Sequence, residues 1–355
     1  MKAQKNIAVI LDQALDRRIT FQEAQSLLNV EGKNFEKLLE VSRIVTDREI
    51  GRILRTYYPS RMFPPISITG TYCKLKCAHC NGHYLKHMIP APTPEKLYQL
   101  CLNLQREGAI GCLISGGSTN DGYVPLEPYV DVIKRIKADT DLVLNVHTGL
   151  LGTDLAEGLS EAKIDVASID VVGDNETIHS VYGLNKTVED YEIALNAHLR
   201  AGIKHIVPHV CIGLNFGKIS GELNALKMIQ KIDPEILVFI TIIPTRGTPM
   251  ESVHSPSVKT VVKIIAISRL MFRKISISLG CMRPGGLYRR ELDCLALNAV
   301  DRIGIPTPSV LKKAEELGLK IEKYPSCCAL PYEFEARIKD KAGKLNSLNA
   351  GNSTL

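Results

Sequence analysis

Three cysteines within eight positions are the residues of this chain most able to do chemistry. Cys73, Cys77 and Cys80 form a CxxxCxxC pattern directly after an apolar run. Three answers compete for this pattern: a disulfide framework, a zinc site, or an iron–sulfur cluster with one iron left open. The chain has ten cysteines and no recognisable signal peptide. In a reducing compartment, that combination favours metal or redox chemistry over structural disulfides.

The choice between zinc and iron depends on how many ligands the segment supplies. A structural zinc ion needs four ligands, and here the fourth would be His79, His83 or His87. A [4Fe–4S] cluster held by three local thiolates keeps one iron free to bind a small molecule. The compact triplet favours the cluster. A zinc-stabilised scaffold is the alternative outside the enzymes, and an electron carrier would normally close all four positions with cysteine.

The elements that must position the triplet alternate between apolar runs and helical segments. Continuous apolar runs are typical of strands buried on both faces, and strand–helix alternation indicates a parallel sheet. We predict strands at Ile66–Gly70, Gly111–Ser115, Leu142–His147, Val166–Val172, Ile206–Ile212, Leu237–Ile243 and Ile275–Leu279. Helices are predicted near 94–107, 127–138, 153–161, 188–201, 219–231, 257–272 and 287–299. The pattern predicts an α/β fold, a (βα) TIM-type barrel that is complete or partial.

The two ends of the chain are predicted to add to this barrel. Residues 5–58 read as helix, with a capping box at Thr20 and Glu23 and an apolar helical stripe over about 33–57. We expect 1–58 to be a helical segment packed on the barrel and 59–305 to be the barrel. Residues 306–355 are expected to form a C-terminal extension with a cysteine pair and a polar tail.

Several candidate site residues directly follow the predicted strands. Ligands of parallel α/β folds bind at the carboxyl ends of the strands, so residues placed there are expected to converge with Cys73 on one face. These residues are Ser115, Gly116, Gly117, His147, Thr148, Asp170, Gly213, Pro244 and Cys281.

With His79 before its last cysteine, the triplet resembles the signature of the radical S-adenosylmethionine (SAM) superfamily. The segment "LISGGSTNDG" resembles that family's glycine-rich segment after the second strand, with Ser118 where the family has an acidic residue. "CIGLNFGKISGE" and "IIPTRGTPM" are similar to the segments after the fifth and sixth strands of biotin-synthase-type members. The resemblance covers roughly residues 30–300.

The resemblance implies a mechanism and a role for each residue. Cys73, Cys77 and Cys80 would hold a [4Fe–4S] cluster whose open iron binds SAM, and the resulting 5′-deoxyadenosyl radical would remove hydrogen from an unactivated carbon. The residues implied to bind the cofactor are His79, near the adenine, with Ser115, Gly116, Gly117, Asp170, Gly213 and Pro244. The residues expected at the substrate are His147, Thr148 and Arg283, and the alternative for Arg283 is a surface salt bridge.

The remaining cysteines decide whether a second cluster is expected. Cys112 and Cys211 fall where biotin synthase has two ligands of its second cluster, but "LNVHTGLL" lacks the third, and lone cysteines on apolar strands are usually inert core residues. Four later cysteines are predicted to hold an auxiliary cluster, with one of the adjacent pair as a ligand: Cys281, Cys294, Cys327 and Cys328. The alternative is a core position for Cys294 and a loop position for the pair.

An auxiliary cluster points toward sulfur insertion. The whole pattern resembles the archaeal biotin-synthase homologues, including the two-component lipoyl synthases. That resemblance implies sulfur insertion into an octanoyl chain on a lysine of a carrier protein, with a paralogous radical SAM partner. An electron donor such as ferredoxin or flavodoxin is also implied. The alternative is a biotin synthase-like or other cofactor-biosynthesis enzyme with a single cluster.

Composition and charge exclude other classes of function. The net charge of +6 over 355 residues is mild, and Lys and Arg are spread along the chain, so we expect no nucleic-acid partner. No segment approaches 18 uncharged apolar residues, so we expect no membrane partner. With 45% hydrophobic residues, the chain can bury a large core. We expect a cytoplasmic protein.

Overall fold

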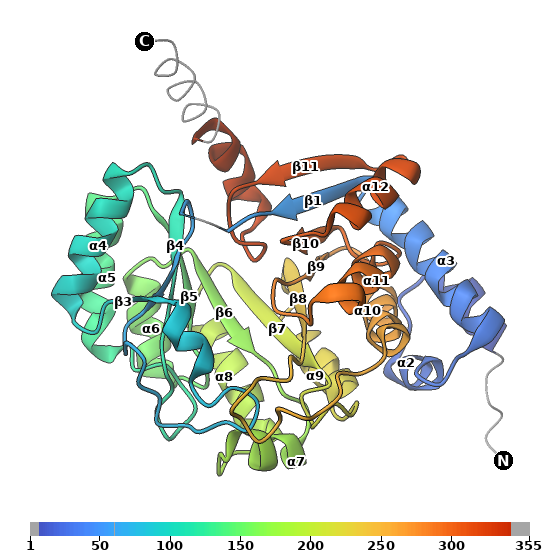
Figure 1. The fold of residues 1–355 in the computed structure, drawn as a ribbon, viewed down its shortest axis with the longest axis horizontal. Helices are drawn as coiled ribbons and strands as arrows, with labels where there is room; N and C mark the ends of the chain where they lie inside the picture. The colour runs from blue at the N-terminus through green and yellow to red at the C-terminus, as the bar shows by residue number, and fades with distance from the viewer. Residues whose placement is uncertain (1–6, 60, 342–355) are drawn as a thin grey trace.

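A computed structural model describes residues 7–59 and 61–341 of the chain. Its centre is one sheet of eleven strands in the order β11-β1-β10-β9-β8-β7-β6-β5-β4-β2-β3 (Figure 1). Every neighbouring pair is parallel. The strands are β1 (Ile53–Tyr57), β2 (Pro65–Ser67), β3 (Ile89–Pro90), β4 (Gly111–Ser115), β5 (Val143–His147), β6 (Val166–Asp170), β7 (Ile206–Ile212), β8 (Ile236–Thr241), β9 (Ser276–Leu279), β10 (Arg302–Gly304) and β11 (Lys320–Tyr324).

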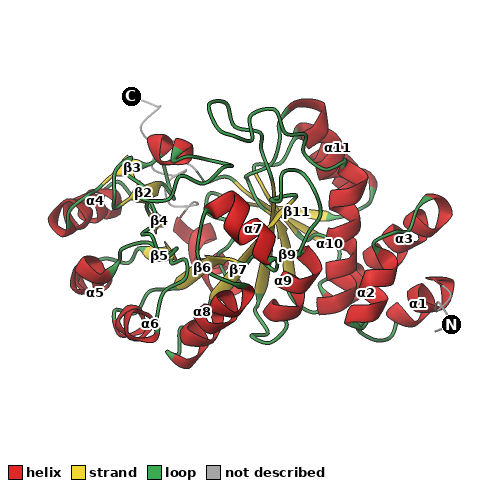
Figure 2. Ribbon diagram, turned by 90° about the horizontal axis from the view of Figure 1, so that it is seen from below, coloured by secondary structure: helices red, strands yellow, loops and turns green. Residues whose placement is uncertain are grey.

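The helices lie along the outer side of this curled sheet (Figures 1 and 2). The α-helices are α1 (Ile7–Ala14), α2 (Phe21–Leu27), α3 (Gly32–Glu49), α4 (Pro94–Arg106), α5 (Val130–Asp139), α6 (Thr153–Glu161), α7 (Asn175–Thr177), α8 (Val188–Arg200), α9 (Glu222–Ile229), α10 (Val258–Phe272), α11 (Gly286–Ala296) and α12 (Pro308–Glu316). Short 3-10 or π segments are η1 (His83–His87), η2 (Glu127–Tyr129), η3 (Ile178–Tyr182) and η4 (Tyr332–Phe334).

The fold class is the one that the alternation predicts, a partial TIM-type α/β barrel. The seven predicted strands are confirmed as β2 and β4 to β9, with ends that differ by a few residues. The capping box at α2 is also confirmed. The Glu23 amide donates to Thr20 Oγ1 at 3.3 Å, and the Thr20 amide donates to Glu23 Oε2 at 2.9 Å.

The prediction of helix through residue 58 is wrong in its last part. Helix α3 ends at Glu49, and Gly51 follows with a φ of +99°, a value that favours glycine. Strand β1 then pairs with β10 on one side and β11 on the other. These three strands are short and contain charged residues such as Arg55 and Arg302, so no apolar run marks them in the sequence.

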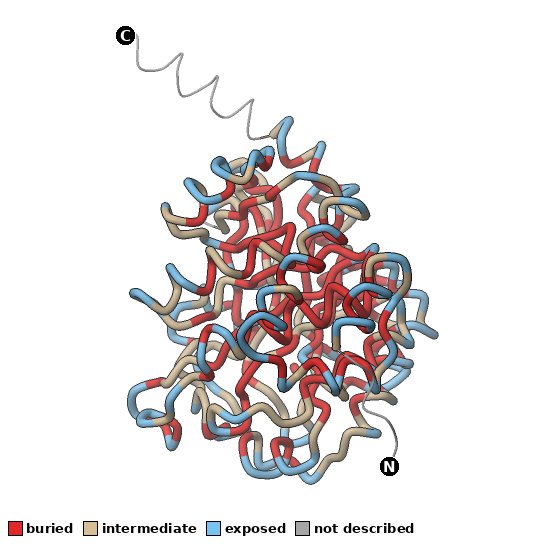
Figure 3. The backbone as a smooth tube through the Cα atoms, turned by 90° about the vertical axis from the view of Figure 1, so that its right-hand side faces the viewer, coloured by how far each residue is buried: buried red, intermediate tan, exposed pale blue. Residues whose placement is uncertain are grey.

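Two apolar cores lie on opposite faces of the sheet. Figure 3 shows the buried residues gathered in the interior and the exposed ones at the periphery. The larger core lies between the outer face and the helices. The smaller one gathers residues near the amino ends of the strands, such as Val143, Val166 and Ile236, and the segment from Cys328 to Ile338 packs onto it. The C-terminal segment therefore closes the amino end of the barrel. No helix within the described residues is long and apolar enough to cross a membrane.

Candidate active site

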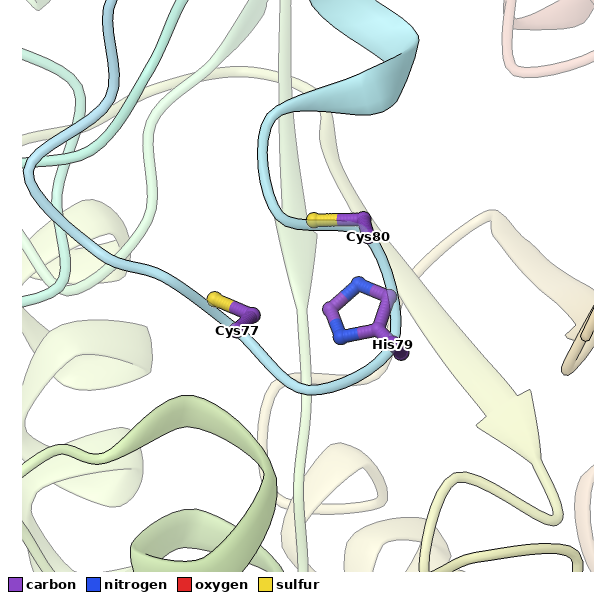
Figure 4. Close-up of side chains that lie close together, drawn as sticks. All are labelled: Cys77, His79 and Cys80. Atoms are coloured by element: carbon purple, nitrogen blue, oxygen red, sulfur yellow. The ribbon is translucent and has the colours of Figure 1, made fainter. Parts of the chain in front are cut away.

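The predicted cysteine loop follows β2 and brings three ligand atoms together. The ligand atoms of Cys77, His79 and Cys80 all lie within 4.8 Å of one another on the inner side of one turn (Figure 4). The turn is closed by the Cys80 amide, which donates to the Cys77 carbonyl at 3.2 Å, and by the Asn81 amide, which donates to the same carbonyl at 2.9 Å. Gly82 continues it with a φ of +73°.

The loop after β4 holds the first cysteine. The Ser118 amide donates to Cys73 Sγ at 3.2 Å, and the Gly117 amide donates to Thr69 Oγ1 at 2.7 Å. A Cβ at Gly117 would lie 2.0 Å from the Tyr72 carbonyl oxygen and 2.5 Å from Cys73 Cα. Glycine is therefore required where the two loops meet. The backbone of the predicted "GGS" segment thus supports the cysteine loop directly.

The thiols of this loop favour metal ligation. The hydrogen bond from Cys77 lowers the pKa of Cys80 to about 4, and the same bond, with burial, raises the pKa of the Cys77 thiol. The pKa of Cys77 is also raised by Cys73, so the third thiol lies near the pair. Thiolates are the form that binds metals, and the donor set therefore fits a thiolate-held cluster. His79 Nδ1 is buried without a hydrogen-bond partner, so the same atoms could also hold zinc.

The "GTPM" segment after β8 supports the cysteine loop from the other side. The Met250 amide donates to the Ala78 carbonyl at 3.2 Å, and the Tyr84 hydroxyl lies 2.9 Å from Thr245 Oγ1. Thr245 follows the predicted Pro244, which is half-buried in the loop three residues after β8. The sequence analysis missed Tyr84, although its place four residues after the last cysteine could have marked it.

The predicted glycine-rich segment after β7 carries a buried carboxyl. Gly213 has a φ of +80°, and a Cβ there would lie 2.3 Å from Pro256. Its amide donates to Glu222 Oε1 at 2.8 Å. Burial raises the pKa of Glu222 to about 7. Two other cofactor-binding candidates lie at the end of β4. Ser115 is the last residue of this strand, and its carbonyl accepts a hydrogen bond from the Ile68 amide at 2.8 Å. Gly116 is the next residue.

Three side chains on neighbouring strands face the inside of the barrel. The rings of His147 on β5 and His209 on β7 are 5.4 Å apart, and Asp170 ends β6 between them with an exposed side chain. Burial lowers the pKa of His147, an effect that Asp170 opposes, and burial lowers the pKa of His209 to about 4. Two neutral imidazoles therefore lie beside one carboxylate. The sequence left the direction of His209 open, and the structure turns it inward.

Two predictions for the substrate site are wrong. Thr148 is buried and pairs with His198 of α8 at 2.8 Å. It faces the outer layer, because neighbouring strand residues point to opposite faces and His147 faces inward. Arg283 is fully buried, and its Nε donates to Asp293 at 2.7 Å. Its other nitrogens donate to backbone carbonyls of Gly280, Gly304 and Ile305, so its guanidinium has a structural role and its salt bridge is buried, not on the surface.

A second group of thiols lies on the inner face of the barrel. Cys281 follows β9, and burial followed by the charge of Cys328 raises its pKa to about 11. Cys327 and Cys328 share a hydrogen bond, which lowers the pKa of Cys328 to about 7. Asn145 Nδ2 lies 3.9 Å from Cys327 Sγ, and Asn145 is two residues before the inward-facing His147. The thiol of Cys281 at the end of β9 and those of the C-terminal pair therefore lie within electrostatic reach of one another.

The other cysteines do not join this group. Cys294, predicted as a fourth ligand, lies half-buried on α11, where charges of Asp293 and of Lys313 on α12 act on its thiol. Cys112 faces the outer core and shares a hydrogen bond with Cys101 of α4, which confirms its interpretation as a core residue. Cys211 is partly buried, and its pKa is raised by burial and by Asp170, so it lies near the polar inner wall.

Comparisons with known proteins agree with this site. Residues 67–220 match the model of the radical SAM superfamily. The crystal structure of methylornithine synthase superposes with a TM-score of 0.65 and 20% identity, covering 88% of this chain and 97% of that one. The [FeFe]-hydrogenase maturase HydG gives a TM-score of 0.70 and 18% identity, covering 96% of this chain and 81% of that one.

The matched segment contains the cysteine loop and most of the strands that surround it, so residues 67–220 form a radical SAM domain. It is 23% identical to 3-methylornithine synthase of Methanosarcina barkeri, over 72% of this chain and 71% of the relative. It is 24% identical to biotin synthase of Citrifermentans bemidjiense, over 71% of this chain and 76% of that enzyme. The chain thus has a radical SAM domain and is similar to both enzymes.

Proposed function

We propose that this radical SAM enzyme inserts sulfur into unactivated C–H bonds of an octanoyl chain carried on a lysine of an acceptor protein. The observation that carries the proposal is the second thiol group, Cys281, Cys327 and Cys328, on the inner face of the barrel. The substrate comes from the resemblance to two-component lipoyl synthases, which also suggests a paralogous radical SAM partner.

The first thiol group would hold the cluster that binds SAM. A [4Fe–4S] cluster with an open iron supplies the electron that cleaves the S–C5′ bond of the bound cofactor. The residues of this chain position and protect the reactants. Cys73, Cys77 and Cys80 supply three thiolates, and the backbone at Gly117 and Ser118 fixes the loop that carries them. Asp170 is placed to accept hydrogen bonds from the cofactor or from a polar group of the substrate.

The second thiol group would hold an auxiliary cluster, whose chemistry when bound is to supply sulfide. Asn145 contacts Cys327 and lies two residues before His147 on the same face of β5. Two residues along a strand span about 7 Å, so the second group lies one step deeper in the barrel than His147. A substrate chain that enters past Asp170 and His147 would reach Cys327 from the side of the first site.

We further propose that a ferredoxin or flavodoxin supplies the electron at the cysteine loop. No Asp or Glu occurs from Ile68 to Pro94, and the exposed side chains in that segment include Lys74, Lys76 and Tyr72. Such a surface favours encounter with an acidic electron carrier. Salt should therefore slow reduction of the cluster by the carrier more than reduction by dithionite.

A rearrangement at a single cluster is the second candidate. The polar group His147, Asp170 and His209 suits a substrate with charged or hydrogen-bonding groups, and methylornithine synthase is among the relatives. An aliphatic chain would not need these side chains. The number of clusters separates the two candidates.

An anaerobic iron and sulfide count, with Mössbauer spectra, on the Cys73/Cys77/Cys80→Ala variant tests the proposal. About four irons should remain if the second thiol group holds a [4Fe–4S] cluster. Wild-type enzyme, alone or with a paralogue, should then form a sulfur-bearing octanoyl-lysyl peptide from SAM and a reductant. A variant without iron would contradict sulfur insertion and favour the rearrangement.

A further inference from the structure

The segment that carries the second thiol pair has little regular structure of its own. Residues 325–331 belong to no helix or strand, and Ser326 Oγ is buried without a hydrogen-bond partner. Inside the segment, the Leu330 amide donates to the Cys327 carbonyl at 3.3 Å. Its shape must therefore be set largely by contacts with the barrel.

One arginine makes several of these contacts. Arg302 of β10 is fully buried, and its NH1 group donates to the carbonyls of Leu330 at 2.6 Å and Cys328 at 3.4 Å. Its NH2 group donates to Glu335 at 2.9 Å. The guanidinium also lies 4.5 Å from the centre of the Tyr332 ring. A single side chain thus contacts the second half of the segment, at Cys328 and Leu330, and the two residues Tyr332 and Glu335 that follow it.

The partner of this arginine gathers donors from three adjacent strands. Glu335 accepts from Arg302 on β10, from Arg55 on β1 at 3.2 Å and from Tyr57 on β1 at 3.0 Å. The Tyr324 hydroxyl on β11 lies 3.0 Å from Glu335 and shares its one proton between Glu335 and Glu322, which is at 2.6 Å. A buried carboxylate and guanidinium are costly unless their hydrogen-bonding groups are satisfied together. Four side chains from three strands therefore hold Glu335 in one position.

We propose that Arg302 and Glu335 are positioning residues, a buried clamp that holds Cys327 and Cys328 at the inner wall of the barrel for the auxiliary cluster. This inference rests on the proposed function for its metal. The clamp itself fixes the position of two thiols, Cys327 and Cys328, and this can be tested without the metal. Loss of the clamp should change the second thiol group and leave the cysteine loop of Cys73, Cys77 and Cys80 unchanged.

A matched control is available on α10. Arg269 is also fully buried, pairs with Asp301 at 2.8 Å and donates to the carbonyls of Ala299 and Ile275. Within the described chain Arg269 itself makes no hydrogen bond to residues 326–335, and its partner Asp301 reaches them only through the Tyr332 hydroxyl at 3.4 Å. Arg269→Lys should therefore weaken the fold by breaking a similar network without releasing the cysteine pair.

The first experiment counts auxiliary iron in the Cys73/Cys77/Cys80→Ala background. Adding Arg302→Lys should lower the affinity for this iron about 10-fold, and adding Glu335→Gln should lower it less. Adding Arg269→Lys should leave the iron at the parent value even though the melting temperature falls. Parent-level iron in the Arg302→Lys protein, or equal loss in the Arg269→Lys protein, would overturn the clamp.

A second experiment does not depend on iron. The metal-free chain is treated with a maleimide, and labelling of Cys327 and Cys328 is followed by mass spectrometry, with Cys101 as the internal reference. Arg302→Lys should speed labelling of the pair several-fold relative to Cys101, and Arg269→Lys should not. If the parent binds no auxiliary iron, the proposed function fails. Unchanged labelling in Arg302→Lys would then reject the clamp separately.

Discussion

The two thiol groups of this protein are built in opposite ways. Cys73, Cys77 and Cys80 lie on one loop, whose turn is closed by hydrogen bonds between neighbours and whose outside is supported by the loops after β4 and β8. The second group takes Cys281 from the end of β9 and Cys327 with Cys328 from a segment after the last strand. A local site depends on loop conformation, whereas a site assembled from distant segments depends on the whole sheet. The two groups should therefore respond to different substitutions.

The largest effect is expected at the local site. Cys77→Ala should abolish 5′-deoxyadenosine formation, because the cluster that binds SAM loses one of its three protein ligands. The product is measured by liquid chromatography after incubation with SAM and dithionite. Cys101→Ala, which removes a buried thiol on α4, serves as the control and should keep the activity. Persistent product in the Cys77 variant would mean that the triplet does not bind the cofactor's cluster.

The next largest effect separates the two groups. Cys328→Ala should remove the sulfur-containing product and keep 5′-deoxyadenosine formation, because the first cluster stays intact. Both products are followed in one reaction by mass spectrometry. Cys294→Ala should leave both unchanged, since Cys294 lies on α11 beside α12. Equal loss of both products in the Cys328 variant would show that the two sites are not independent.

A third substitution strains the local loop without touching a thiol. Gly117→Ala places a Cβ 2.0 Å from the Tyr72 carbonyl oxygen, so the cysteine loop must move. A shift of about 1 Å at a reacting group can lower the rate roughly 100-fold. We expect kcat for 5′-deoxyadenosine formation to fall by that order. Gly152→Ala meets no atom within 4 Å and should have no effect. An unaffected Gly117 variant would mean that the loop has more freedom than its contacts indicate.

The last prediction concerns stability, not activity, at the buried carboxyl of Glu222 beside Gly213. Burial raises the pKa of Glu222 from its ordinary 4.5 to about 7, so the folded protein binds this proton more tightly than the unfolded chain. The proton on Glu222 therefore stabilises the folded state fully below pH 4.5. As the pH rises from 4.5 to 7 this stabilisation is lost, and the free energy of unfolding falls by about 3 kcal/mol. Denaturant unfolding of Glu222→Gln and wild-type should show a free-energy difference that grows in favour of the variant from pH 5 to pH 8. A constant difference would contradict the raised pKa.

The contrast between the sites also explains what could be read from the sequence. The strand–helix alternation is a local pattern that the structure confirms, and the CxxxCxxC loop is a local pattern whose Cys77 and Cys80 lie close together. Thr148 was misplaced because a strand can direct only one of two adjacent residues inward, and apolar runs on both faces hide which one. Arg283 was misread because its partner Asp293 becomes adjacent only when α11 packs on the barrel.

The second thiol group was only partly predictable for the same reason. Cys281, Cys327 and Cys328 were found as residues, but Cys294 was included with them because no sequence pattern reports the face of α11 that turns inward. Strands β1, β10 and β11 were missed because they are short and charged. Arg302 lies on β10, which is only three residues long, and Glu335 lies in the C-terminal segment after β11. No apolar pattern in the sequence marks either position, so the clamp between them could not be predicted.

The pairing of β1 has a consequence for how the enzyme matures on the ribosome. This strand lies near the start of the chain, yet its neighbours are β10 and β11, and Arg55 is paired with both Arg302 and Glu322. The cysteine loop is translated early, whereas β1 must wait for almost the whole chain before its neighbours exist. The contacts that support the cysteine loop end at Met250, so the first site is complete in the chain before β10 and β11 are made. The thiols of the second group come together only after synthesis has passed Cys328. The two thiol groups are thus assembled at different times because of the topology of the sheet.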